Sequence, residues 1–195
     1  MSTHEDALRS TALVVVDVQR AFDDPAFGRR SNPACEENVG RLIAHWRDAS
    51  APVVFVRHDS RSPGSPLSPS QPGNRFKPVI EGTPDLLVAK HVHSAFFGTP
   101  DLDGWLRERG LTGVAVCGIQ TNFCCETTAR MAANLGYELT FVLDATHTFD
   151  LPTPDGGRIA AEELERATAA NLAAEFGVVT STEDLVEEGP QLKRT

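Results

Sequence analysis

The sequence predicts an α/β protein in which helices cover both faces of a parallel sheet. Short apolar runs alternate with longer amphipathic stretches along the 195 residues, which is the order of a βαβ fold. The apolar runs are continuous and rich in valine, as in strands that are buried on both sides. Neither a repeat nor a linker interrupts this alternation, so we expect a single domain spanning residues 1–195.

The first half of the chain is expected to supply three strands and one long helix. Its first strand is centred on Ala12-Leu-Val-Val-Val16, a continuous β-branched run typical of a central strand. The helix places Val39, Leu42, Ile43 and Trp46 on one stripe, which predicts that this face is buried. The expected bounds are strand Thr11–Asp17, helix Pro33–Ser50, strand Pro52–Arg57 and strand Asp85–Ala89.

A long proline-rich segment, Ser60–Pro78, lies between the second and third of these strands. Such composition is usual in solvated linkers, but long loops inside compact domains often serve as lids or binding loops. Arg75, Phe76 and Lys77 are candidates to anchor it. We therefore expect this loop to border the active site.

The second half continues the alternation to the end of the sheet. Glycines at positions 113 and 118 bound a short apolar strand, and Gly136 and Gly177 stand where helices should end. The expected bounds are helix Leu102–Arg109, strand Val114–Cys117, a helix that opens near Cys124 and ends at Leu135, strand Glu138–Leu143, loop Thr146–Gly157, helix Arg158–Phe176, strand Val178–Ser181 and a short helix from Thr182.

Composition excludes several classes of protein. The net charge of −9 and the isoelectric point of about 5.1 disfavour binding to nucleic acid or to anionic membranes. No apolar run is long enough to cross a bilayer, and the N-terminus lacks the pattern of a signal peptide. Four cysteines, two of them adjacent, do not form a disulfide framework. A cytoplasmic protein is the simplest interpretation.

Cys124 is the leading candidate for a nucleophile. Thr121 and Asn122 are capping residues that place Cys124 in the first turn of a helix. Free N–H groups and the helix dipole favour an anion there, so we expect the pKa of this thiol to be lowered. The alternative is that Cys124 is simply a small buried hydrophobe. Cys125, Cys117 and Cys35 are interpreted as structural.

Charged and polar residues follow the strands that should lie beside the cysteine turn. Asp17, His58 and Lys90 each come at the end of a predicted strand, and ligands of open α/β sheets bind outside the carboxyl ends of the strands. Asp17 is suited to take the thiol proton, and Lys90 to hold the two anions. An ordinary Asp17–Lys90 ion pair at a strand end is the competing interpretation.

Three ordered motifs, taken together, resemble the isochorismatase-like cysteine hydrolase superfamily. They are Asp17-Val-Gln, Lys90 followed by Ser94-Ala-Phe, and Gly118-Ile-Gln-Thr-Asn-Phe-Cys124 with Thr128-Ala-Arg130. The resemblance implies a three-layer αβα sandwich with a six-stranded parallel sheet. It also implies an Asp17–Lys90–Cys124 triad, a cis peptide most naturally at Ile119–Gln120, and an oxyanion hole formed by the backbone amides of Gln120 and Cys124.

The resemblance also bears on activity. The presence of Cys124 favours hydrolysis of a C–N bond in a small molecule through a covalent intermediate. The alternatives are a vinyl-ether hydrolase of the isochorismatase type and a catalytically silent scaffold. His58-Asp-Ser stands where zinc-dependent nicotinamidases carry Asp-x-His, so we expect neither a metal nor another cofactor. The family further implies a homodimer or homotetramer.

Several further side chains are candidates for contact with substrate or metal. Cys124 and Arg130 have the spacing of cysteine phosphatases, but the intervening turn lacks a glycine and Glu126 would repel a phosphate. The adjacent Cys124 and Cys125 suggest a redox sensor, but neighbouring residues form a disulfide poorly because the geometry of the bond is demanding. His58, His91 and His93 are the candidates for a metal site. The predicted substrate contacts are Gln19, Phe22, His58, Phe96, Phe97, His147 and Phe149.

Overall fold

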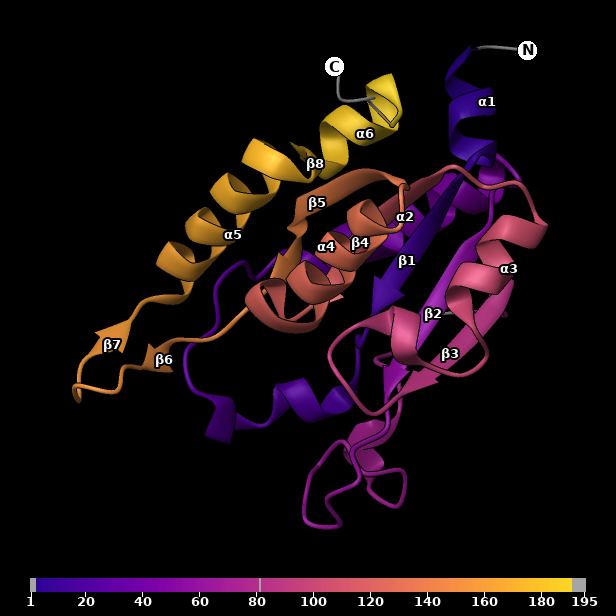
Figure 1. Cartoon of the computed structure of the whole chain (residues 1–195). Coiled ribbons are helices and arrows are strands. Elements are labelled where there is room, and N and C mark those ends of the chain that lie inside the picture. Colours follow the sequence, from indigo (N-terminus) through magenta and orange to yellow (C-terminus); the bar gives the residue numbers. More distant parts are fainter. Residues whose placement is uncertain (1–2, 81, 191–195) are drawn as a thin grey trace.

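A six-stranded parallel sheet forms the centre of the molecule (Figure 1). The computed structural model of the chain describes residues 3–80 and 82–190. The strand order is β3-β2-β1-β4-β5-β8, so the direction of winding reverses between β1 and β4, where α/β sheets bind their ligands. The strands are β1 (Thr11–Val16), β2 (Val53–His58), β3 (Leu86–Lys90), β4 (Gly113–Ile119), β5 (Glu138–His147) and β8 (Gly177–Thr180).

Helices cover the two faces of this sheet in separate layers (Figure 1). Their buried residues divide between two core clusters, one on each side of the strands. The predicted three-layer αβα sandwich with a six-stranded parallel sheet is confirmed. One face carries α1 (Thr3–Arg9), α2 (Cys35–Asp48) and α6 (Thr182–Glu188), and the other carries α3 (Leu102–Glu108), α4 (Glu126–Asn134) and α5 (Ala161–Glu175).

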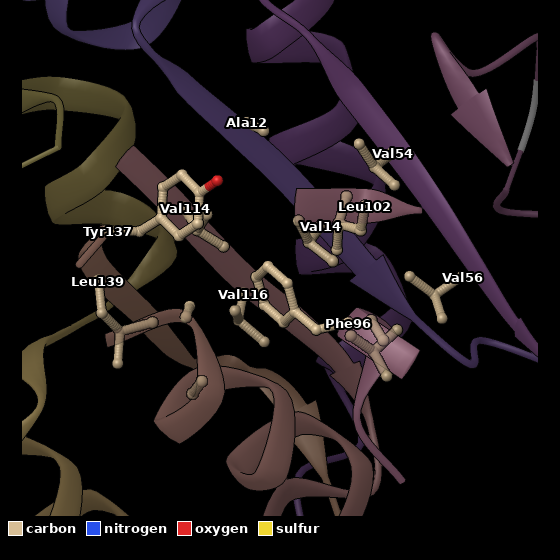
Figure 2. Packing of buried hydrophobic residues seen from close by; sticks show 14 of the residues in the cluster. Ala12, Val14, Val54, Val56, Phe96, Leu102, Val114, Val116, Tyr137 and Leu139 are labelled. Atoms are coloured by element: carbon tan, nitrogen blue, oxygen red, sulfur yellow. The ribbon is translucent and has the colours of Figure 1, made fainter. Parts of the chain in front are cut away.

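Strand β1 connects the two halves of the core. Leu13 and Val15 pack on the α2 side, whereas Val14 and Val16 pack on the α4 side among valines of β2 and β4 (Figure 2). Each fully buried valine or leucine side chain stabilises the fold by roughly 1.5–3 kcal/mol relative to exposure. Because both faces are covered, the strand is apolar throughout, which is why it could be recognised from the sequence.

The connection from β4 to α4 is tighter than an ordinary helix start. Gly118 has a φ of 123°, and a Cβ there would lie 2.0 Å from the carbonyl oxygen of Val16, so the position requires glycine. The Ile119–Gln120 peptide bond is cis. A π-helical turn, η5 (Thr121–Cys125), follows and continues into α4. Cys124 therefore lies in a π turn ahead of the α-helix.

Other elements differ from the predictions in length. Strand β5 runs on to His147, past the predicted end at Leu143, because Thr146 and His147 pair with β4 beyond a register shift. The loop predicted at residues 146–157 contains part of a small hairpin, β6 (Leu151–Pro152) and β7 (Arg158–Ile159). Helix α1 was not predicted. No helix within the described part of the chain is both long and apolar enough to span a bilayer.

Short 3-10 segments connect the longer elements near the carboxyl edge of the sheet. Two of them follow β1, one lies in the proline-rich loop, and one follows β3. They bring loop residues beside the strand ends. These segments are η1 (Arg20–Asp23), η2 (Pro25–Phe27), η3 (Pro72–Asn74) and η4 (Ala95–Phe97).

Candidate active site

The Lys90 ammonium lies at the centre of a cluster formed by three other elements. Its Nζ atom is 2.6 Å from Asp17 Oδ2, 3.1 Å from His58 Nδ1 and 3.3 Å from Cys124 Sγ. Lys90 and Asp17 are both fully buried. An ammonium has three N–H donors, and each of them has one acceptor here. The parallel strands thus bring together the acid, the cation and the thiol at one point.

Asp17 is oriented by a sharp change of backbone direction after β1. Its φ is 51°, its N–H donates to the Val56 carbonyl, and its own carbonyl accepts from the Gln19 N–H. One carboxylate oxygen is held by Lys90. The other, Oδ1, is buried without a hydrogen-bond partner among the described residues, which leaves it a lone pair available to accept a proton.

His58 is a neutral member of the cluster. Burial, followed by the nearby charge of Lys90, lowers the pKa of its imidazole. Since the ammonium can only donate, Nδ1 accepts from it, and the single proton of the neutral ring resides on Nε2. Gln19 fixes this residue by accepting from the His58 N–H at 2.9 Å and donating to its carbonyl at 3.1 Å. The imidazole therefore offers an N–H at the strand end.

The thiol of Cys124 is protonated in the free protein, contrary to the expectation from its place at the start of a helix. Burial raises its pKa, the Asp17 carboxylate raises it further, and Lys90 lowers it by less. Burial lowers the pKa of Lys90, but the attraction of the Asp17 carboxylate and the hydrogen bonds to Asp17 and Cys124 outweigh this effect, so the pKa of Lys90 is raised. The resting charges are thus those of the Lys90–Asp17 pair, and the prediction of a lowered cysteine pKa is wrong.

Possible metal ligands surround the same ammonium. Asp17, His58 and Cys124 place one ligand atom each within 4.8 Å of one another, yet all three contact Lys90 Nζ. The Lys90 ammonium therefore supplies the positive charge that these three atoms share. His91, also considered as a ligand, directs Nδ1 to the Asp59 carbonyl.

A pocket of about 270 Å³ opens onto the thiol. Its polar side is formed by Asp17, His58 and Cys124 of the cluster, together with His93 and Gln120. His93 Nδ1 lies 3.5 Å from Cys124 Sγ, and its ring stacks on Phe123 with centroids 5.9 Å apart. The remaining wall is apolar and consists of Phe22, Phe27, Leu67 and Phe123.

Some of the predicted substrate contacts line this pocket, and others do not. Phe22 and His58 do. Gln19 is fully buried and bonds to main-chain groups instead, so it positions His58. Phe96 packs in the core among the valines of β1, β2 and β4 and stacks on Tyr137 (Figure 2). Phe97 is 68% exposed and lines a neighbouring hollow.

The other two predicted aromatic contacts lie outside the pocket lining. His147 is fully buried at the end of β5, with its ring edge-on to Phe149. Phe149 stacks on Phe27 at 5.0 Å between centroids, so it supports the pocket wall without lining it. Phe96, Phe97, His147 and Phe149, four of the predicted substrate contacts, are thus absent from the lining of this pocket, whose apolar wall is formed by Phe22, Phe27, Leu67 and Phe123.

Sequence reasoning missed Phe27, Leu67 and Phe123 as pocket residues and His93 as a neighbour of the thiol. Phe27 and Leu67 belong to irregular segments without a periodic pattern that could show which way they point. A signal did exist for Phe123, which precedes the candidate nucleophile, and for His93, which lies within the Lys90 to Ser94-Ala-Phe motif.

The proline-rich loop is anchored firmly beside the pocket. Asn74, 6% exposed, donates from Nδ2 to the carbonyls of His58 and Leu67 and to the Asp59 carboxylate. Lys77 binds Asp23 and Glu36, each at 2.6 Å. Leu67, between these anchors and β2, lines the pocket. The expectation that the loop borders the site agrees with this arrangement.

The phosphatase and redox interpretations lack their structural requirements. Arg130 binds Glu126 at 2.6 Å and lies over the Phe176 ring, and it does not line the pocket. Cys125 is completely buried, and burial raises its pKa far above the usual range. All four cysteines are free.

Fold and site together define a parallel α/β protein that carries a cysteine, an acid and a lysine at the switch point of its sheet. The chain belongs to the isochorismatase family, whose domain model matches residues 11–184. It is 32% identical to the isochorismatase family protein YrdC of Bacillus subtilis over 178 residues, 91% of this chain and 95% of that protein. It is 35% identical to nicotinamidase 3 of Arabidopsis thaliana over 89% of this chain and 86% of that enzyme.

The solved structures agree with this assignment. A hydrolase of the isochorismatase family from Chromobacterium violaceum superposes with a TM-score of 0.86 at 37% identity, over 91% of this chain and 92% of that one. The chain therefore has the fold of this family of hydrolases and belongs to it.

Proposed function

We propose that the protein hydrolyses a C–N bond, such as an amide, ureido or lactam bond, of a small molecule, with Cys124 as nucleophile, Asp17 as base and Lys90 as the fixed cation. The observation that carries this proposal is the contact of Lys90 Nζ with both Asp17 Oδ2 and Cys124 Sγ, next to an unpartnered Asp17 Oδ1. An ordinary strand-end ion pair would have no reason to include a thiol or to leave a buried carboxylate oxygen unpaired.

The first half-reaction transfers one proton and forms one bond. As Cys124 Sγ attacks the carbonyl carbon, its proton passes to Asp17 Oδ1, so a free thiolate need not accumulate in a buried site. The carbonyl oxygen takes up the negative charge, and the amides of Gln120 and Cys124 are the proposed donors to it. Protonated Asp17 then gives its proton to the leaving nitrogen, the C–N bond breaks, and a thioester remains.

The second half-reaction restores the enzyme. Asp17 removes a proton from water as the water oxygen attacks the thioester carbon. The tetrahedral intermediate collapses with loss of the cysteine sulfur, which regains the proton. Amide and water are thereby converted to acid and amine. Lys90 remains an ammonium throughout, because its raised pKa keeps the proton bound.

The relatives support the bond type. Nicotinamidase 3 is an amidase by its name, and this chain carries a cysteine, Cys124, in the motif by which it resembles the family. We further propose a homodimer or homotetramer, as the family resemblance implies. Phe97 and Val92, 68% and 47% exposed beside the pocket, support a subunit contact there, and light scattering at several protein concentrations tests it.

An amide panel tests the proposed reaction. Nicotinamide, maleamide, N-carbamoyl amino acids, ureidoacrylate and cyclic lactams are assayed for released ammonia or for new amine. Wild type should turn over at least one of them, and Cys124→Ala should lose the activity by about 10³-fold or more. Cys125→Ala, which removes the adjacent buried thiol, serves as the matched control and should retain activity. Equal turnover by wild type and Cys124→Ala refutes the proposal.

A further inference from the structure

The walls of the pocket carry information about the charge of the substrate. Among the described residues that line it, none is lysine or arginine. Lys90 lies behind these residues, and its three N–H donors are directed to Asp17, His58 and Cys124. His58 is neutral because burial and Lys90 lower the pKa of its imidazole. A carboxylate on the substrate would therefore find no cation free to bind it.

Among the described residues that line the pocket, the acidic side chain is that of Asp17. The Oδ1 atom of this carboxylate has no hydrogen-bond partner in the part of the chain that the structure describes. A substrate carboxylate would lose its water shell against four apolar side chains and would also approach this anion, and both effects oppose binding. Arg61 lies in the neighbouring hollow with Phe97 and Met131 and does not line the pocket.

The size and rigidity of the apolar wall indicate what would bind instead. An apolar cavity of roughly 150 Å³ binds benzene, so about 270 Å³ accommodates a single ring with a carboxamide group. Phe22 and Phe27 contact each other at 5.3 Å between centroids, and Phe149 supports Phe27 from behind at 5.0 Å. This wall is preorganised for a flat or compact apolar group.

We infer that the site accepts uncharged, compact amides with an apolar or aromatic body and rejects carboxylate-bearing ones. The inference rests on the proposed function, because it assigns the substrate class of the same thiol. His58 Nε2–H and the His93 ring supply polar contacts, while Phe22, Phe27, Leu67 and Phe123 contact the body of the substrate.

The test uses two alkylating reagents of nearly equal size and opposite character. Iodoacetamide is neutral and iodoacetate is an anion, and both react when sulfur displaces iodide from carbon. Rate constants for Cys124 are measured at one pH by peptide mass spectrometry, with Cys124→Ser as the blank and 2-mercaptoethanol as the reference thiol. The ratio of the two rates cancels the thiolate fraction, so it reports the pocket alone.

We expect the iodoacetamide-to-iodoacetate ratio at Cys124 to exceed that of 2-mercaptoethanol by about 30-fold or more, since an unpaired buried charge is strongly disfavoured. Leu67→Arg should lower the ratio by about tenfold by adding a cation to the wall, whereas Leu67→Gln should not. Arg61→Gln should leave it unchanged. A ratio equal to that of the reference thiol overturns the inference.

Turnover separates this inference from the proposed function. Maleamide and maleamate differ only by replacement of one amide with a carboxylate, and we expect maleamide to have the higher kcat/KM by about 30-fold or more. Equal or preferred hydrolysis of maleamate that depends on Cys124 overturns the charge preference and leaves the proposed function standing. Hydrolysis that does not depend on Cys124 overturns the proposed function, while the alkylation ratio still decides the charge preference.

Discussion

Replacing Lys90 by methionine tests whether the buried cluster is coupled as the structure has it. Methionine retains most of the unbranched side chain of lysine but removes its charge and its three N–H donors. Asp17, which is completely buried, would lose the 2.6 Å contact of its Oδ2 atom. Its Oδ1 atom has no partner among the described residues, so the carboxylate would be stranded in the protein interior.

The expected loss of stability is large compared with the total. Removing one partner of a buried ion pair costs about 3–5 kcal/mol, out of a free energy of unfolding of about 5–15 kcal/mol for a typical domain. For a chain of this length that loss corresponds to a decrease in Tm of roughly 6–20 °C. Urea unfolding at pH 7, followed by circular dichroism, measures it directly.

The double variant Asp17→Asn, Lys90→Met is the matched control. It removes both charges, so no uncompensated ion remains, and asparagine tolerates the left-handed φ of 51° at position 17. We expect it to regain most of the lost stability, to within about 1 kcal/mol of wild type. Both variants should lack Cys124-dependent hydrolysis, because the proposed reaction uses Asp17 as its base and Lys90 as its fixed cation.

Two outcomes would contradict this reasoning. A Lys90→Met protein within about 1 kcal/mol of wild type would show that Asp17 is not stranded. A double variant as unstable as the single one would show that the loss comes from packing and not from the unpaired charge.

The remaining predictions concern acid stability and the loop. Burial, with Arg30, lowers the pKa of His147 from 6.5 to about 3; the unfolded chain then binds the proton first, so stability falls as pH drops from 6.5 towards 3. Between pH 6.5 and 5, the free energy of unfolding of His147→Leu, measured by urea titration, should fall by about 2 kcal/mol less than that of wild type. Equal decreases in the two proteins would contradict this prediction. Asn74→Ala removes the donations from Nδ2 that tie the loop to the end of β2, so we expect a loss of about 1–3 kcal/mol in the free energy of unfolding. Proteolysis near Leu67 should be faster than in Ser70→Ala, and unchanged cleavage would exclude an anchoring role.

The sheet could be predicted well, and its connections less well. Strand β1 is buried on both faces, so its apolar run is continuous and its limits are clear. The end of β5 was missed because Asp144 and His147 read as loop residues, yet the strand continues past a register shift to pair with β4. The short hairpin of β6 and β7 has two residues per strand, too few to produce a pattern.

The pKa of the Cys124 thiol is shifted in the opposite direction to the one that its place at the start of a helix predicts. A helix N-terminus favours a thiolate, and this was the basis for expecting a low pKa. In the folded protein, burial raises the pKa of Cys124 most, Asp17 raises it further, and Lys90 lowers it by less. The sequence contains every group involved but not the depth at which each one lies.

The amino-acid sequence by itself determined that Asp17, Lys90 and the Cys124 turn meet, because parallel strands all deliver their carboxyl ends to the same edge of the sheet. The tertiary structure alone decided which side chains form the pocket and how the thiol is protonated. Phe27 and Leu67 come from irregular loops whose direction no periodicity encodes. The charge state depends on burial, which all the surrounding segments create together.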